Sequence, residues 1–123
     1  FRKSDIFSSI YDNEKFDIIV SNPPYIPISA KDTLDNVVKN FDPSIALFTQ
    51  DKDGVEFYEK ILKGAKKHLK PNGYVLFEIG FTNGISQSAI VAEIARSYGF
   101  AMEFIEKDLS GIDRVMGFSR QCP

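Results

Sequence analysis

The sequence has almost none of the residues from which metal and redox sites are built. It contains one cysteine, Cys122, and one histidine, His68, in 123 residues. A lone cysteine cannot form a disulfide within the chain, and the paired cysteines and histidines of a zinc site are missing. We therefore expect no metal site and no redox chemistry. A chain without disulfides fits a reducing compartment, so we expect a cytoplasmic protein.

Long hydrophobic runs are missing too. The two longest, residues 16–20 and 74–77, are far shorter than the roughly 20 apolar residues that cross a bilayer. We therefore expect no membrane partner. The chain begins with neither a methionine nor a secretion signal, and we interpret it as part of a longer protein.

An excess of basic residues, which marks domains that clamp nucleic acid, is absent as well. Fifteen lysines and arginines stand against seventeen acidic residues, which gives a net charge of -2. This balance disfavours nucleic acid as a partner. What the sequence does contain, 43% hydrophobic and 26% charged residues, is typical of one globular domain with a modest core.

Hydrophobic periodicity predicts strands that alternate with helices. Residues 16–21 are apolar on both faces, which is typical of a strand buried inside a parallel sheet. Apolar residues recur at helical spacing over 55–69 and 90–98, and a second buried strand over 74–80 lies between them. The first helix is predicted to stop before Pro71-Asn72-Gly73. This order predicts parallel pairing through helical crossovers.

The end of the chain has a different pattern. Two apolar segments, 100–105 and 114–118, flank a polar turn at 108–111 and predict an antiparallel hairpin. A parallel α/β sheet closed by an antiparallel strand resembles the layout of S-adenosylmethionine-dependent methyltransferases. We therefore expect an α/β fold, the carboxy-terminal half of such a Rossmann-like methyltransferase sheet, ending in an antiparallel hairpin.

Candidate functional residues follow the first predicted strand, at Asn22-Pro23-Pro24-Tyr25. Prolines cannot continue a strand ladder, so the chain leaves the sheet at the carboxyl end of a strand, where open α/β sheets bind ligands. The connection that follows, residues 23–54, is longer than an ordinary loop, which favours a functional loop. A rigid turn without further function is the alternative.

These residue types suit methyl transfer to a planar nitrogen. The lone pair of an amide or of a base amino group is spread into its π system, and two acceptors aimed at its two N–H bonds localise it. Asn22 offers its side-chain oxygen and Pro23 its carbonyl, so we predict these two as the catalytic residues. Tyr25 offers a flat face for stacking. The predicted substrate site is Asn22, Pro23, Pro24 and Tyr25.

An ordered series of short motifs runs along the chain. It comprises Ser4-Asp5-Ile6-Phe7, residues 16–26, Asp42-Pro43, Ala46-Leu47, Asp53-Gly54, Phe57-Tyr58, residues 69–73, Glu78-Ile79-Gly80 and Asp113-Arg114-Val115. This series resembles the HemK (PrmC) type protein-glutamine methyltransferases, which modify the glutamine of the Gly-Gly-Gln motif in peptide chain release factors. Asn-Pro-Pro-Tyr alone is shared with adenine-amino DNA methyltransferases, so by itself it indicates only the reaction class.

The resemblance implies S-adenosyl-L-methionine as the cofactor and a release factor as the protein substrate. It implies that the residues from Asn22 to Tyr25 bind the glutamine, and that Asn22 also lies against the methyl group of the cofactor. Asp5 and Ile6 would lie near the adenine, where the Asp5 carboxylate can accept from the amino group. A turn cap is the alternative role of Asp5.

Three positions depart from the family pattern and bear on individual contacts. Asp42 stands where the family more often has glutamate, Ile6 where an aromatic residue or leucine is common, and Asn83 where a glutamine often follows the Glu-Ile-Gly.

The resemblance also implies that part of the site is not in this chain. In the family, the Gly-rich turn for the methionine part of the cofactor and the acidic residue that binds the ribose precede the position of Phe1. We therefore interpret residues 1–123 as a single partial methyltransferase domain without its amino-terminal cofactor-binding half, inactive on its own. The strand from Phe16 to Val20 would then be a sheet edge, and we expect self-association through it.

Two other functions stay open. The first is an adenine-amino methyltransferase acting on DNA or RNA, for which the acidic balance offers no basic groove. The second is a non-catalytic module that packs against a partner supplying the cofactor half. Elsewhere, His68 is predicted to complement a helix end in solvent. Glu78 is predicted to serve either the site or a structural hydrogen bond.

Overall fold

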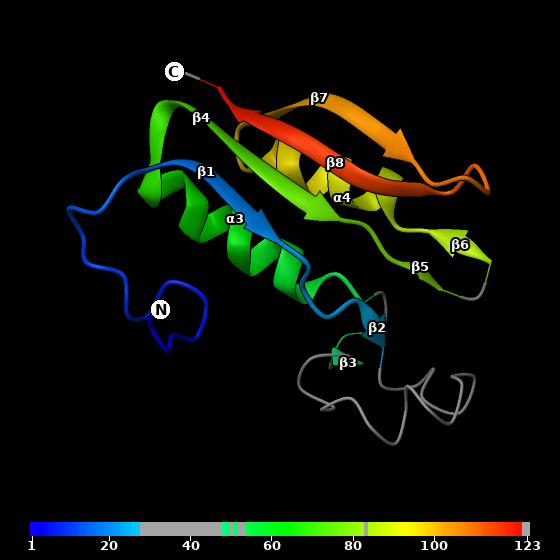
Figure 1. Cartoon of the computed structure of the whole chain (residues 1–123), viewed down its shortest axis with the longest axis horizontal. Coiled ribbons are helices and arrows are strands. Elements are labelled where there is room, and N and C mark those ends of the chain that lie inside the picture. Colours follow the sequence, from blue (N-terminus) through cyan, green and yellow to red (C-terminus); the bar gives the residue numbers. More distant parts are fainter. Residues whose placement is uncertain (28–47, 50, 52–53, 83, 122–123) are drawn as a thin grey trace.

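The computed structural model describes residues 1–27, 48–49, 51, 54–82 and 84–121. Within these residues the main sheet has four strands in the order β1, β4, β8, β7, with two helices packed on it (Figure 1). The bounds are β1 (Phe16–Ser21), α3 (Glu56–His68), β4 (Leu69–Glu78), α4 (Ser88–Ser97), β7 (Phe100–Lys107) and β8 (Asp113–Arg120). Two short pairs lie outside this sheet, β2 (Ile26–Pro27) with β3 (Phe48–Thr49) and β5 (Phe81–Thr82) with β6 (Ile85–Ser86).

The strand pairing follows the predicted pattern. β1 and β4 pair in parallel across the α3 crossover, and β7 and β8 form the antiparallel hairpin. β8 also pairs antiparallel with β4, so it lies between the parallel pair and β7. The predicted mixed α/β sheet with its terminal hairpin is therefore confirmed.

Asp108 holds the turn of this hairpin. Its carboxylate accepts hydrogen bonds from the N–H groups of Ser110 at 2.8 Å and Ile112 at 3.0 Å. The Arg114 guanidinium donates to the same carboxylate at 3.0 Å. The N–H of Ile112, followed by the Arg114 guanidinium, lowers the pKa of Asp108 below its ordinary value.

Both helices cover the same face of the sheet (Figure 1). α3 packs there because Tyr58, Leu62 and Ala65 recur on one side and are fully buried. The Tyr58 hydroxyl donates to the carbonyl of Glu78 at 2.8 Å and accepts from the N–H of Gly80 at 3.2 Å. Burial raises the pKa of Tyr58, so this phenol stays neutral. No helix among the described residues is both long enough and apolar enough to cross a membrane.

The opposite face of the sheet is open, because none of the described elements covers it. Ile18 and Val20 of β1 are 56% and 73% exposed, and Tyr74 and Phe104 on the neighbouring strands are exposed as well. β1 has the apolar pattern of a buried strand, but it is exposed on this face, which agrees with the prediction that it is a sheet edge in this chain. Only Ile19 of its apolar centre packs on the core. β1 also lies at the edge of the described sheet.

α3 ends at His68, ahead of Pro71-Asn72-Gly73, as predicted. β4 begins at Leu69, directly after the helix, so Pro71-Asn72-Gly73 lie within the strand. Phe16 is paired with Leu69, whereas Ile18 is paired with Tyr74. This shift in register absorbs the extra residues, which explains how a proline is tolerated in the ladder.

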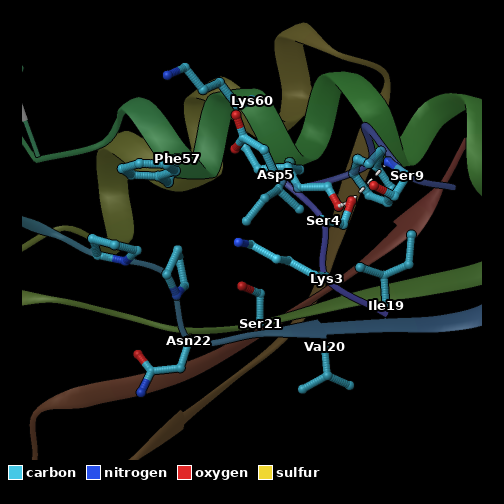
Figure 2. Close-up of a pocket in the computed structure, with 15 residues that line it drawn as sticks. Lys3, Ser4, Asp5, Ser9, Ile19, Val20, Ser21, Asn22, Phe57 and Lys60 are labelled. Atoms are coloured by element: carbon cyan, nitrogen blue, oxygen red, sulfur yellow. Dashed lines mark hydrogen bonds between the residues drawn. The ribbon is translucent and has the colours of Figure 1, made fainter. Parts of the chain in front are cut away.

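His68 is buried rather than solvated, being only 3% exposed. Its ring stacks on Phe7 with the ring centroids 5.2 Å apart, and its Nδ1 lies 3.0 Å from the Glu14 carbonyl oxygen. Phe7 also packs on Gly64, where a Cβ would lie 2.2 Å from the ring. These contacts anchor the amino-terminal segment on α3 and so place Asp5 beside that helix (Figure 2).

Candidate functional site

A cleft of about 1040 Å³ lies between the amino-terminal segment, α3 and the carboxyl end of β1. Five of the six predicted site residues line it: Asp5, Ile6, Asn22, Pro23 and Pro24. Tyr25, the sixth, is half-buried and packs against the core. The volume is at the upper end of ordinary small-molecule sites, and the position is where open α/β sheets bind ligands.

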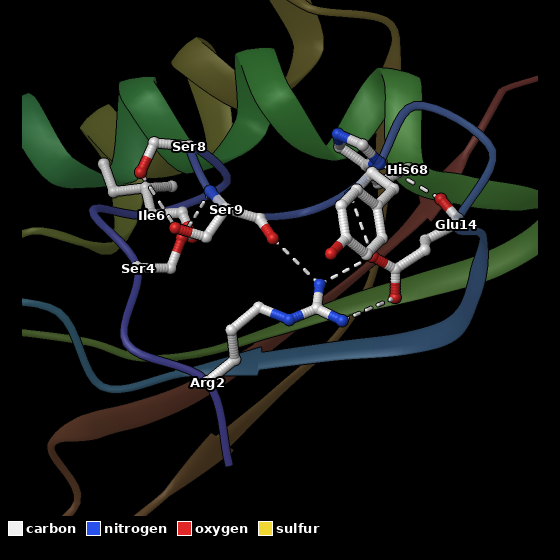
Figure 3. Close-up of polar contacts among 8 residues, drawn as sticks. Arg2, Ser4, Ile6, Ser8, Ser9, Glu14 and His68 are labelled. Atoms are coloured by element: carbon white, nitrogen blue, oxygen red, sulfur yellow. Dashed lines mark hydrogen bonds and ion pairs between the residues drawn. The ribbon is translucent and has the colours of Figure 1, made fainter.

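Serine hydroxyls shape the turn that carries Asp5. The Ser4 hydroxyl donates to the Ile6 carbonyl at 2.9 Å and accepts from the Ser9 N–H at 2.9 Å (Figure 3). The Ser8 hydroxyl accepts from the Asp5 N–H at 3.0 Å. The turn is therefore capped by serines, and the Asp5 carboxylate is not used as the cap. In Figure 2 this carboxylate points toward α3 on the cleft wall.

Ile6 has a strained backbone. Its φ is 53°, in the left-handed region, and it is the sole described residue other than glycine with a positive φ. A β-branched residue adopts this conformation at a cost of about 1–3 kcal/mol, and such strain clusters at ligand sites. The strain and the cleft together make Asp5 and Ile6 a candidate functional segment.

Ser21 and Asn22, at the carboxyl end of β1, point to opposite sides of the strand (Figure 2). Figure 2 shows Ser21 pointing into the cleft, whereas Asn22 points to the same side as Val20, away from Asp5. Asn22 is exposed and Pro23 is buried. The structure thus brings Asn22 and Asp5 to one cleft without direct contact between their side chains.

Tyr25 is fixed by its neighbours. Its ring packs so closely on Gly80 that a Cβ there would lie 2.4 Å from the tyrosine Cδ2. Burial, and then the nearby charge of Glu78, raises the pKa of Tyr25. The phenol therefore stays neutral at ordinary pH. Glu78 itself takes part in structure through its carbonyl, which accepts from Tyr58.

Other residues of the cleft were not predicted as site residues from the sequence. Lys3 points into the cleft, and Phe57 and Lys60 line its α3 wall (Figure 2). The ammonium of Lys60 lies 5.1 Å from the centroid of the Phe57 ring, which is cation–π distance. Helical spacing could have grouped these residues, because Phe57, Lys60 and Ile61 are three and four positions apart and so fall on one side of α3.

Several motif positions do not join the cleft. The Asp113 carboxylate accepts from the Ser88 hydroxyl at 2.7 Å and pairs with Lys107, so this position fastens β8 to its neighbours. Six further motif positions lie outside the described residues: Asp42, Pro43, Ala46, Leu47, Asp53 and Asn83. Among the described residues, no cluster of histidine, cysteine and acidic side chains could hold a metal ion.

Gly54, at the end of the long connection, leads to a stability prediction. Its φ is 70°, and an added Cβ would lie 2.1 Å from the Tyr25 carbonyl oxygen. Gly54→Ala is therefore expected to lower the free energy of unfolding by about 3 kcal/mol or more. Gly111 is the matched control, because its φ is 79° but no atom lies within 4 Å of an added Cβ. Gly111→Ala should cost only the backbone strain, about 1–2 kcal/mol. Equal losses in urea denaturation would contradict the close Gly54–Tyr25 contact.

Comparison with known proteins places this site in a family. Residues 1–87 match the family described as Eco57I restriction-modification methylase. The chain is 46% identical over 108 residues to a bifunctional methyltransferase of Rickettsia prowazekii (strain Madrid E), covering 88% of this chain and 20% of that protein. It is 42% identical over 116 residues to a release factor glutamine methyltransferase of Fusobacterium nucleatum, covering 94% of this chain and 31% of that protein. The chain thus spans a fifth to a third of the length of these relatives.

A solved structure has the same fold. The protein-(glutamine-N5) methyltransferase (release factor-specific) from Alicyclobacillus acidocaldarius superposes with a TM-score of 0.52 at 28% identity, covering 88% of this chain and 50% of that one. The predicted methyltransferase fold is thereby confirmed. The chain belongs to the Eco57I restriction-modification methylase family, and its predicted resemblance to the release factor glutamine methyltransferases is confirmed.

Proposed function

We propose that this chain is the acceptor-binding part of an S-adenosylmethionine-dependent enzyme that methylates the side-chain amide nitrogen of a glutamine in peptide chain release factors. One observation carries the proposal: Asn22 and Pro23 directly follow β1 and line the cleft that Asp5 also lines. The likeness to proteins named release factor glutamine methyltransferases supports the substrate. A release factor as substrate puts the reaction in the cytoplasm.

The acceptor residues have a defined task in this reaction. When bound, S-adenosylmethionine would supply a methyl group on positively charged sulfur. The Asn22 oxygen and the Pro23 carbonyl accept the two amide N–H groups of glutamine, which turns the nitrogen lone pair toward that methyl group. Pro24 has no N–H that could compete for these acceptors. The neutral, half-buried Tyr25 fixes the end of the turn and offers part of its ring to the amide.

The residues of the cleft fit an adenine group. The Asp5 carboxylate is free of the turn, which Ser4 and Ser8 cap, and can accept from an exocyclic amino group. Ile6 offers an apolar contact beside it, and Phe57 offers an aromatic face. We assign these residues to the adenine part of the cofactor.

We further propose that residues outside this chain complete the cofactor site. The outer edge of β1 and the open face with Ile18 and Val20 are where a further strand and helices would pack. The greater length of the curated relatives supports this assignment. Residues 1–123 are then a partial domain, inactive alone.

A second candidate is an adenine-amino methyltransferase, which the match to the Eco57I restriction-modification methylase family favours. An exocyclic amino group of adenine is also a planar nitrogen that Asn22 and Pro23 could orient. The net charge of -2 argues against a nucleic acid groove in this part of the protein.

Parallel methyl transfer assays decide between these substrates. The full-length protein is given tritiated S-adenosylmethionine with either a release factor or adenine-containing DNA. We expect the label in the release factor, and its loss when the glutamine of the Gly-Gly-Gln motif is replaced by alanine. Label appearing mainly in the DNA would make the second candidate correct.

A further inference from the structure

Gln87 is a buried polar side chain that the proposed chemistry does not use. It precedes α4, is 6% exposed, and lies behind the turn formed by residues 22–25, which we call the acceptor turn. Its side-chain Nε2 donates to the carbonyl of Tyr25 at 3.1 Å and to the carbonyl of Gly54 at 3.3 Å. One amide thus joins the two ends of the long connection. We propose that Gln87 is a positioning residue that sets the acceptor turn for methyl transfer.

The backbone around Gln87 leaves its amide little freedom. Its own N–H donates to the Gly80 carbonyl at 3.0 Å, and its carbonyl accepts from the Val91 N–H at 3.0 Å. A Cβ at Gly80 would lie 2.2 Å from the Gln87 Oε1, and one at Gly54 would lie 2.8 Å from the Nε2. Glycines on both sides therefore allow the amide to pack directly against backbone. Because the side chain is packed this tightly, a shift of the backbone at Gly80 or Gly54 would also shift the Gln87 amide.

A path of short contacts connects this amide to the core. The Tyr58 hydroxyl bridges the Glu78 carbonyl and the Gly80 N–H, which fixes Gly80. Gly80 in turn fixes Gln87, and Gln87 holds the carbonyl of Tyr25, 62 residues away in sequence. The acceptor turn is thereby tied to the rigid centre of the domain.

The effect on chemistry follows from the two prolines. Pro23 and Pro24 have fixed φ angles, so fewer free backbone rotations separate Tyr25 from Asn22, and a displacement at Tyr25 is carried toward Asn22 more directly. A misplacement of about 1 Å at a reacting group can cost about 100-fold in rate. This step rests on the proposed function, because it takes Asn22 and Pro23 as the groups that orient the acceptor nitrogen.

The test compares three variants of the full-length protein. Gln87→Glu keeps the shape but turns a carboxylate toward two carbonyl oxygens, and Gln87→Met keeps similar bulk without a donor. Gln121→Glu makes the same chemical change at an exposed position and is the control. For both Gln87 variants we expect kcat on a release factor to fall about 10- to 100-fold. The dissociation constant for S-adenosylmethionine should change less than about 3-fold, because Gln87 does not line the cleft.

Two further readouts separate positioning from simple loss of packing. Hydrogen exchange measured by mass spectrometry should speed up in the peptide covering residues 22–27 in both Gln87 variants, under conditions where α3 stays protected. Gln87→Glu should regain part of its kcat as the pH falls, because a protonated carboxyl group can donate to the Tyr25 carbonyl again. Gln87→Met should show no such recovery.

The possible results test the positioning role of Gln87 and the proposed function separately. Wild-type kcat and wild-type exchange in Gln87→Met would overturn the positioning role, and so would equal losses in kcat and in cofactor affinity. If Gln87→Glu does not fold, Gln87→Asn replaces it, and faster exchange at residues 22–27 is again the expected result. If the unaltered protein methylates no release factor, the proposed function fails, while the exchange experiment still decides whether Gln87 holds the acceptor turn.

Discussion

Replacing Asn22 with alanine is expected to lower the turnover rate of the full-length protein by a factor of roughly 100 to 1000, the loss typical of one oriented polar group at a reacting centre. Asn22 directly follows β1 at the cleft and is exposed, so its side chain contributes little to packing. Removing its oxygen leaves one N–H of the acceptor amide without its partner. A single-turnover methyl transfer assay on a release factor measures the effect, and cofactor affinity should change much less.

Two variants make this experiment specific. Asn72→Ala is the same substitution at an exposed site on β4, away from the cleft, and should leave turnover unchanged. Asn22→Asp keeps a side-chain oxygen as acceptor, so it should lose less activity than the alanine variant. Near-normal turnover in Asn22→Ala would remove Asn22 from the mechanism.

The regular elements could be predicted because each has a local cause. The helical recurrence of Tyr58, Leu62 and Ala65 is a property of adjacent turns, and it produced α3 where the spacing placed it. The hairpin was equally local, since Asp108 organises its own turn. Parallel pairing of β1 with β4 then followed from the helix between them.

The errors all involve contacts between distant parts of the chain. His68 was expected in solvent because nothing near it in sequence covers it, yet Phe7 stacks on its ring. Val20 belongs to a strand with the apolar pattern of a buried element and is 73% exposed, because that pattern does not specify which residues cover the strand. Burial is a property of the partner surface as much as of the residue.

In the candidate site too, residues with a local sequence signal were predicted and residues defined by distant contacts were missed. Proline chemistry and strand position were enough to mark Asn22 and Pro23 from the sequence. Gln87 gave no comparable signal, because a single glutamine ahead of a predicted helix belongs to no motif that points to a site. Its partners, Tyr25 and Gly54, become visible only when the strands bring them together.

The open side of the sheet determines how the isolated chain should behave. β1 is the edge of the described sheet, so the outer side of its backbone is a template for another strand. The exposed side chains of Ile18 and Val20 add an apolar surface that favours association with another chain. The main charge near this strand, Asp17, is paired with Lys70 at 2.9 Å and protects the edge only weakly.

We therefore expect the isolated 123-residue chain to self-associate through the edge from Phe16 to Val20 and to bind S-adenosylmethionine very weakly or not at all. Sedimentation and light scattering at tens of micromolar measure the first effect, and calorimetric titration measures the second. Val20→Lys should shift the chain toward monomer, because a charge on the exposed strand opposes pairing. Leu109→Lys, at the fully exposed hairpin tip, is the control and should leave association unchanged. A stable monomer that binds the cofactor tightly would show that this face needs no cover and that the cofactor site is complete in these residues.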